Sequence, residues 1–274
     1  MDYDRAYANA DFIPNALAYP ADWARAAAEL RAARAARSRL DLAYGPGARQ
    51  KLDLFLPDGD PVGLVVYIHG GYWMRFDRAD WSGFAAGPLA RGWAVAMPSY
   101  TLAPEARIRD ITAEIAAAIA LAAHEVPGPI ALTGHSAGGH LVARMNGADV
   151  PLPDAVAARI ARIVAISPVA DLRPLLRTRM NATLRLTPAE AEAESPVLAT
   201  ARRGIATTAW VGAEERPAFL DQARWLADAW AEARLHIAPG RHHFDVIDPL
   251  TEPESALVAL LVGAGAACST RPGV

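Results

Sequence analysis

The stretch Pro129-Ile-Ala-Leu-Thr-Gly-His-Ser-Ala-Gly-Gly-His-Leu141 decides how the rest of the chain is interpreted. Its residues 130–132 form a short apolar run, which is typical of a strand buried on both faces. Residues 134–138 then give the pattern G-x-S-x-G, and apolar residues from Leu141 onward recur at helical spacing. The sequence therefore predicts a strand that turns abruptly into a helix, with Ser136 at the turn.

The small residues around Ser136 have a steric reason. Such a turn holds its central residue in a strained backbone conformation, and bulky neighbours would collide. The turn projects the hydroxyl out of the fold, while the first amides of the new helix point at the same place. A Gly-rich turn with an ordinary surface serine would share the bare pattern, so the other motifs must decide between the two interpretations.

Length and composition predict one domain. A chain of 274 residues with 53% hydrophobic content can bury a large core. No linker, charge block or internal repeat divides it. We expect a single domain over residues 1–274, in which residues 1–40 form an N-terminal arm and helix that pack on it and residues 265–274 form a frayed tail.

Charge and cysteine content restrict the partners and the compartment. The net charge is −3, and no basic cluster lies beyond the N-terminal helix, so nucleic acid is not an expected partner. The single Cys268 excludes an internal disulfide framework, and the first residues lack the order of a signal peptide. The longest apolar run, residues 256–268, is too short and too rich in Ala and Gly to span a bilayer. We expect a cytoplasmic protein with no membrane partner, and its oligomeric state is left open.

Apolar runs alternate with helical patterns along most of the chain. This alternation predicts an α/β fold: a mostly parallel central sheet of about eight strands with helices on both faces, after an N-terminal helical extension. Open sheets of this kind place active sites at the carboxyl ends of their strands, where Ser136 lies. Besides the strand and helix around Ser136, we expect strands at residues 41–44 and 50–56 (an antiparallel hairpin), 64–68, 94–97, 160–166, 205–211 and 235–238, and helices at 21–39, 81–91, 108–123, 217–233 and 253–261, with residues 2–20 irregular.

The strand at residues 64–68 ends in the motif His69-Gly-Gly-Tyr-Trp73. Glycines let the backbone come close to a ligand, and free N–H groups there can point at a developing oxyanion. We expect the Gly71 amide to form an oxyanion hole together with the Ala137 amide. The amide of Gly70 or that of Tyr72 is expected to join them.

Aromatic residues beside these motifs are candidates for a substrate pocket. Those in the glycine loop either line the pocket or pack beneath the loop. His69 is expected to brace the loop, and Tyr3 and Tyr7 of the N-terminal arm are expected to cap the pocket. The candidates for the pocket wall are Tyr72, Trp73, Tyr100 and Phe244.

A serine hydroxyl is a weak nucleophile at neutral pH, so it needs a base, and the base needs an orienting carboxylate. Behind a turn of this kind, the chain order is serine, acid, histidine. Two adjacent histidines, His242 and His243, follow the last expected strand, without the companion ligands of a metal site. The residues leave three candidates for the acid: Glu214, Glu215 and Asp171.

The motifs at residues 69–73 and 134–140 resemble the α/β-hydrolase superfamily, and more narrowly its kynurenine formamidase (arylformamidase) branch. The resemblance continues through Ser99–Glu105, Val211–Phe219 and Gly240–Ile247, and so spans roughly residues 40–262. It implies an α/β-hydrolase fold with Glu215 as the acid, where the family usually has Asp, and His243 as the base.

The resemblance also implies a function. We expect a serine hydrolase that cleaves a small acyl or formyl amide or ester through an acyl-serine intermediate on Ser136, with no cofactor and no metal. The substrate expected first is an N-formyl aryl amine such as N-formylkynurenine, which would give kynurenine and formate. A short-acyl carboxylesterase or thioesterase is the alternative, and a non-catalytic ligand receptor on a hydrolase scaffold is a more distant one.

Overall fold

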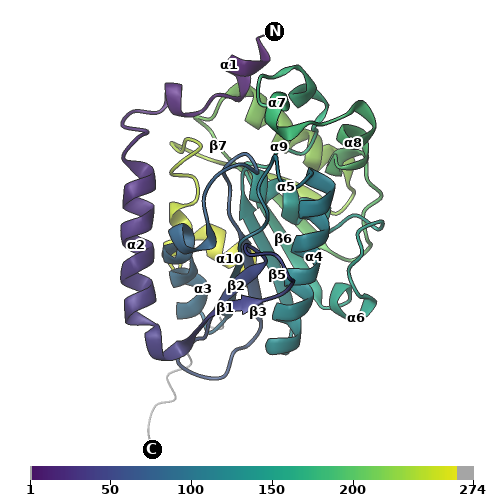
Figure 1. Cartoon of the computed structure of the whole chain (residues 1–274). Helices are drawn as coiled ribbons and strands as arrows, with labels where there is room; N and C mark the ends of the chain where they lie inside the picture. Colours follow the sequence, from purple (N-terminus) through teal and green to yellow (C-terminus); the bar gives the residue numbers. More distant parts are fainter. Residues whose placement is uncertain (1, 264–274) are drawn as a thin grey trace, which may run out of the picture.

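The computed structural model describes residues 2–263, in which the strands form one sheet with the order β1-β2-β4-β3-β5-β6-β7-β8 (Figure 1). The first two strands pair antiparallel with each other, and β2 pairs antiparallel with β4, whereas the remaining neighbours are parallel. The expected frayed tail at residues 265–274 lies outside the described residues. The strands are β1 (Ser38–Ala43), β2 (Lys51–Phe55), β3 (Leu64–Ile68), β4 (Ala94–Pro98), β5 (Ile130–His135), β6 (Ile160–Ile166), β7 (Ala206–Gly212) and β8 (Ala233–Ala238).

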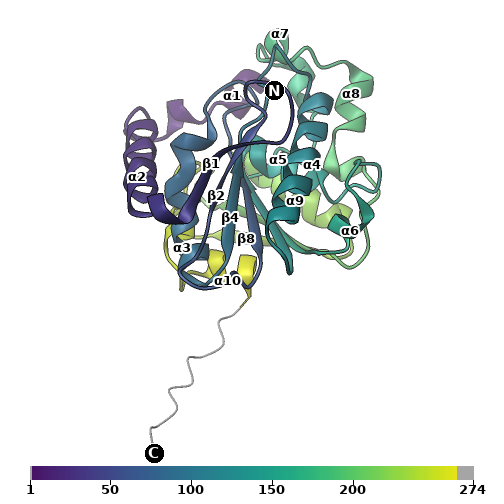
Figure 2. The same ribbon diagram turned by 60° about the horizontal axis from the view of Figure 1, so that its bottom comes forward.

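Helices cover both faces of this sheet. Figure 2 shows α2 and α3 on one side of the strands and α4, α5 and α9 on the other. Among residues 2–263, no helix is both long enough and apolar enough to cross a membrane. The helices are α1 (Tyr3–Tyr7), α2 (Tyr19–Ala33), α3 (Ala86–Ala90), α4 (Ile108–Glu125), α5 (Ala137–Arg144), α6 (Asp154–Ala157), α7 (Asn181–Leu184), α8 (Pro188–Ala193), α9 (Pro217–Ala229) and α10 (Ala256–Val262), with 3-10 turns at Ala10–Phe12, Ala35–Arg37, Arg78–Ala85, Arg173–Arg177, Pro196–Leu198 and Asp248–Thr251.

The central strand β3 shows how the two cores arise. Its alternate residues Leu64, Val66 and Ile68 belong to the core under α4, α5 and α9. Val65 and Tyr67 belong to the opposite core, which α3 and α10 cover and which includes Trp23 of α2. Successive strand residues point to opposite faces, so a strand with a core on each side must be apolar throughout.

Helix α4 confirms the periodic pattern from which it was expected. Its isoleucines at positions 108, 111, 115 and 119 are all fully buried against the sheet. Strands β3 and β6 have the bounds expected from their apolar runs. The α/β architecture with a mostly parallel sheet is therefore confirmed.

The N-terminal part of the chain differs from the expectation. The helix expected at residues 21–39 ends at Ala33, because Ser38 pairs with Phe55 and the chain continues as an edge strand. Residues 2–20, expected to be irregular, contain α1 and a 3-10 turn. The 3-10 turns and short helices between residues 173 and 198 were also not expected, because they are too short to show a periodic pattern.

Helix α2 is fastened to the sheet by charge and by aromatic packing. Arg31 contacts the buried carboxylate of Asp53 at 2.6 Å, and Arg78 contacts the same group at 3.0 Å. Trp23 stacks on Trp81 with ring centroids 4.7 Å apart. A buried carboxylate without partners would be costly, so these pairs fix where α2 lies. The N-terminal segment is consequently held beside the carboxyl ends of the strands.

Candidate active site

Ser136 lies between β5 and α5 in the strained conformation that its motif predicts. Its φ is 58° and its ψ is −113°. A Cβ atom on Gly134 would lie 2.5 Å from the carbonyl oxygen of Gly138, and one on Gly138 would come still closer to the carbonyl of Ile68. Only glycine fits at these two positions, so the motif is a steric requirement of this turn.

The glycine loop lies against this turn. Gly71 has a φ of 112°, and a Cβ atom on Gly70 would lie 2.9 Å from the carbonyl oxygen of His135. Within residues 2–263, the amides of Gly70, Gly71 and Ala137 donate no hydrogen bond. Unpaired amides that converge beside a serine can stabilise negative charge on a substrate oxygen.

His243 and Glu215 form a buried pair. The Nδ1–H of His243 donates to Oε2 of Glu215 at 2.7 Å, and the two side chains are 4% and 0% exposed. The other carboxylate oxygen of Glu215 accepts from Ser167 Oγ at 2.5 Å and from the Gly212 amide at 2.9 Å. These donors fix the longer glutamate arm, which explains how Glu fits where the resembling family usually has Asp.

The competing acids and the neighbouring histidine are engaged elsewhere. Glu214 is exposed, and the carboxylate of Asp171 pairs with Arg173 at 2.7 Å. His242 contacts the hydroxyl of Tyr19 at 3.1 Å and the carboxylate of Asp245. Of the three carboxylates considered from the sequence, Glu215 is the one in contact with His243. Residues 2–263 contain no cluster of three or more His, Cys, Asp or Glu that could hold a metal ion.

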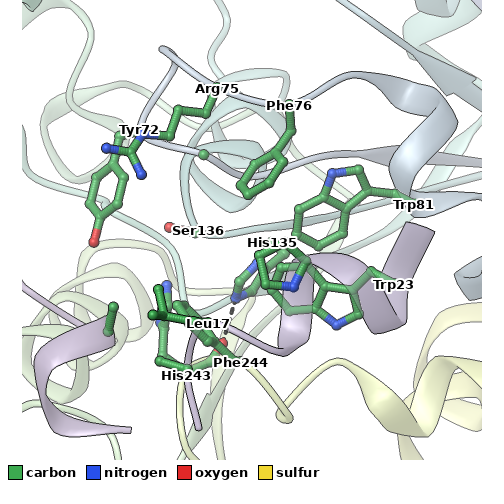
Figure 3. A pocket seen from close by; sticks show the side chains of 14 residues that line it. Leu17, Trp23, Tyr72, Arg75, Phe76, Trp81, His135, Ser136, His243 and Phe244 are labelled. Carbon is green, nitrogen blue, oxygen red and sulfur yellow. Dashed lines mark hydrogen bonds between the residues drawn. The ribbon is translucent and has the colours of Figure 1, made fainter. Parts of the chain in front are cut away.

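Ser136 and His243 line one cavity of about 150 Å³ (Figure 3). Within the described residues, neither Ser136 Oγ nor His243 Nε2 makes a hydrogen bond, so both face the cavity without a protein partner. In enzymes without substrate, the contact between nucleophile and base is often long and tightens in the complex. The cavity therefore brings together the serine, the base and the glycine loop.

The wall of this cavity corrects part of the pocket prediction. Tyr72 and Phe244 line the cavity as expected. Trp73 and Tyr100 do not line it, because both are fully buried behind the loop. Trp73 packs edge-on against His140, while Tyr100 stacks on the ring of His69 at 4.4 Å. These two aromatics, like His69, support the loop from beneath.

The glycine-loop histidine has the bracing position expected for it. The Nδ1–H of His69 donates to the Gly70 carbonyl at 2.8 Å. Burial lowers the pKa of His69 to about 4, so this ring stays neutral near neutral pH.

The N-terminal arm does contribute to the cavity, but through different residues from those expected. Tyr7 is buried against Phe219, and its hydroxyl accepts from Gln222 at 2.7 Å. Tyr3 also lies away from the cavity. The arm residues on the wall are small or apolar; they are Ala10, Ala16, Leu17, Pro20 and Trp23. The expectation rests on the arm folding over the carboxyl edge of the sheet; the arm does reach the cavity, but with residues that follow the two tyrosines, up to the start of α2.

Leu17 should affect substrate binding without affecting stability. Leu17 is 93% exposed as a residue and lines the cavity, so it contributes little to the stability of the folded state. We expect Leu17→Ser to raise KM about threefold to tenfold by removing apolar surface from the bound substrate, with Tm unchanged. The matched control is Leu198→Ser, which removes a half-exposed leucine outside this cavity. Equal KM values for both variants and the wild type would show that the arm does not touch the substrate.

Sequence reasoning gave no role to His135 or Ser167. His135 is buried, and because a carbonyl oxygen only accepts, its Nε2–H donates to the main-chain oxygen of His243 at 2.8 Å. Burial and the nearby His243 lower the pKa of His135 well below its usual range, so the ring is neutral. His135 thus joins the serine turn directly to the loop that carries the base. The position of Ser167 could have indicated its role. It directly follows β6, which lies between β5, the strand before Ser136, and β7, the strand before Glu215.

His135 is therefore expected to position His243. We predict that His135→Phe, which keeps a ring but loses the donor, lowers kcat about tenfold and changes KM less. His135→Gln keeps a side-chain N–H and should restore most of kcat. Equal losses in the two variants would instead indicate a packing role.

The fold and this site define a class of protein: an open α/β sheet that carries a strained serine turn, free amides and a buried His–carboxylate pair at the carboxyl ends of its strands. The chain belongs to the alpha/beta hydrolase fold family, whose model matches residues 65–244.

Relatives narrow this assignment. The chain is 29% identical to the kynurenine formamidase of Danio rerio over 246 residues, or 85% of this chain and 83% of that protein. It is also 29% identical to the kynurenine formamidase of Drosophila melanogaster, over 76% of this chain and 75% of that protein. The expected resemblance to this branch is confirmed, and the chain is a hydrolase of the α/β family.

Solved structures agree on the fold. A protein of Silicibacter sp. TM1040, provisionally described as a thioesterase, is 56% identical and superimposes with a TM-score of 0.93 over 95% of this chain and 99% of that one. Esterase B of Lactobacillus rhamnosis is 18% identical and has a TM-score of 0.63 over 88% of this chain and 90% of its own. The second likeness concerns the fold alone.

Proposed function

We propose that this chain is a serine hydrolase that uses Ser136, His243 and Glu215 as a catalytic triad. The observation that carries the proposal is the buried His243–Glu215 contact of 2.7 Å, with the far side of that imidazole facing the same cavity as Ser136. Glu215 holds the Nδ1 proton of the ring, which leaves Nε2 free to accept a proton.

The reaction proceeds in two halves. Ser136 Oγ attacks the substrate carbonyl carbon while its proton passes to His243 Nε2. The amides of Ala137 and Gly71, with that of Gly70, bind the oxyanion, and the loss of one such donor typically costs about 3–4 kcal/mol of the barrier. The C–N or C–O bond then breaks as His243 gives its proton to the leaving group. Water, deprotonated by the same ring, releases the acid from Ser136.

An N-formyl aryl amine such as N-formylkynurenine is the substrate class that we propose first. A cavity of about 150 Å³ is the size that takes a single benzene ring. Its wall includes Trp23, Phe76 and Trp81, against which such a ring can stack. A formyl group is the smallest acyl group, so it leaves this space to the aryl amine. The relatives with the kynurenine formamidase name support the same choice.

A thioesterase or short-acyl carboxylesterase is the second candidate. The observation that favours it is the 56% identity to the Silicibacter protein, provisionally described as a thioesterase. The same triad would serve this chemistry, because only the leaving atom differs.

Two measurements test the proposal. A fluorophosphonate probe should label Ser136 rapidly, and absence of labelling would remove the enzyme interpretation in favour of a receptor. The values of kcat/KM should then be compared for N-formylkynurenine and for acetyl and butyryl esters and thioesters. We expect the formamide to have the highest value; a higher value for a thioester would assign the second candidate.

A further inference from the structure

Arg75 is a charged residue on the wall of the candidate active site that the reaction above leaves unused. It is exposed, and it lines the cavity together with Tyr72 and Phe76. Figure 3 shows its side chain reaching over Tyr72 on one side of Ser136, with Trp23 and Trp81 on the other side. A substrate ring held by the tryptophans would therefore have this guanidinium across the serine from it.

The loop fixes where Arg75 begins. The amides of Met74 and Arg75 both donate to the carbonyl oxygen of Gly71, at 2.9 and 3.0 Å. Arg49 donates to the carbonyl oxygen of Phe76 at 2.6 Å. The main chain before Arg75 is thus held by the loop that presents the oxyanion amides, and the main chain after it is held by Arg49 from the segment before β2. The Cα atom of Arg75 consequently has a defined position beside the oxyanion amides, and its exposed side chain extends from there along the cavity wall.

The charge of Arg75 is not neutralised by the described part of the chain. Nearby Arg49 and Arg78 both pair with Asp77 at 3.3 Å. Within residues 2–263, the guanidinium of Arg75 makes neither an ion pair nor a hydrogen bond. None of the described residues that line the cavity is Asp or Glu, and the pKa of the lining His135 lies well below its usual range. Arg75 is thus the one fixed charge among them.

We propose that Arg75 is the binding site for an anionic group carried by the substrate, distant from the carbonyl that Ser136 attacks. This inference rests on the proposed function and deepens it, because it selects acyl compounds with a carboxylate or phosphate. A guanidinium presents paired N–H donors that match either anion. The carboxylate would come from an amino-acid side chain on the aryl formamide, and the phosphate from a coenzyme thioester.

Pairs of matched substrates show whether the anion is the carboxylate of an aryl formamide or the phosphate of a coenzyme thioester. N-formylkynurenine is compared with 2-formamidoacetophenone, which keeps the aryl formamide and the ketone but lacks the amino-acid group. Butyryl-coenzyme A is compared with butyryl-N-acetylcysteamine, which keeps the thioester but lacks the phosphates. For the pair that carries the correct anion, we expect the charged member to have a kcat/KM about fivefold to tenfold higher, an advantage that decreases with added salt.

Variants of Arg75 should change the ratio of kcat/KM for the charged substrate to kcat/KM for its neutral counterpart. Arg75→Gln should bring the ratio of charged to neutral substrate close to one, mainly through KM, and Arg75→Lys should keep part of it. The control is Arg234→Gln, which removes an equal charge from exposed strand β8 and should leave the ratio unchanged. A ratio that Arg75→Gln leaves intact in both pairs would overturn the inference.

A binding measurement makes the inference independent of turnover. Titration calorimetry on Ser136→Ala uses kynurenine against 2-aminoacetophenone, and coenzyme A against N-acetylcysteamine. We expect the charged member of one pair to bind about fivefold to tenfold more tightly, and Arg75→Gln in the same background to abolish the difference. No preference in either pair refutes the anion site. If the preference is found but the wild type hydrolyses no substrate, the proposed function fails while the anion site stands.

Discussion

Ser136→Ala is expected to lower kcat by about a millionfold on whichever acyl substrate the wild type hydrolyses best. The size of the effect follows because a catalytic triad acts as a unit. Removing the nucleophile alone lowers kcat about as much as removing all three triad residues. The residual rate should come from the amides of Gly71 and Ala137, which still polarise the carbonyl. Single-turnover and steady-state rates on the purified variant provide the measurement.

The fold of this variant should be intact. Alanine at a φ of 58° carries the same Cβ strain as serine, and within residues 2–263 Ser136 Oγ has no hydrogen bond to lose. We therefore expect Tm to change little, so a loss of rate can be assigned to chemistry. A variant that is folded, fails to react with fluorophosphonate and still turns over near the wild-type rate would remove Ser136 from the mechanism.

The centre of the sheet could be predicted from the sequence because its strands are buried on both faces. Strand β3 is a continuous apolar run and β6 is apolar except for the half-buried Arg162, and polar or turn residues bound both, so composition marks their ends. The edge is different. Strand β1 is mostly exposed, and its residues 38–40 follow an Ala- and Arg-rich helical pattern without a break. Pairing with β2 decides its conformation, and such pairing is not visible in a local pattern.

The same distinction applies to the site. Ser136 and the glycine loop could be found because each is a local motif with a steric reason. The choice of Glu215 among three carboxylates came from the resemblance, since the competing residues differ only in what they contact. His135 and Ser167 act through partners far along the chain, at His243 and Glu215. These contacts depend on strand order, which sequence periodicity does not encode.

Glu215→Gln is expected to lower kcat about a thousandfold to ten-thousandfold, and the contacts of Glu215 explain why. Its Oε1 accepts from Ser167 Oγ and from the Gly212 amide, so the amide oxygen of a glutamine would take that position. The amide NH₂ would then face Nδ1 of His243, which donates a proton to Glu215 in the native chain. The ring must therefore carry its proton on Nε2, the atom that has to accept the proton of Ser136, and the base is lost.

Glu214→Gln is the matched control for this prediction. It makes the same chemical change one residue earlier, on an exposed side chain that does not contact His243, so kcat should stay within about twofold of the wild type. Both variants remove one negative charge, so any difference between them reflects the contact with the imidazole and not the net charge. The reverse result, with Glu214→Gln inactive and Glu215→Gln active, would reassign the acid. Equal activity of both variants would mean that the orientation of His243 does not limit the reaction, and the triad mechanism would have to be abandoned.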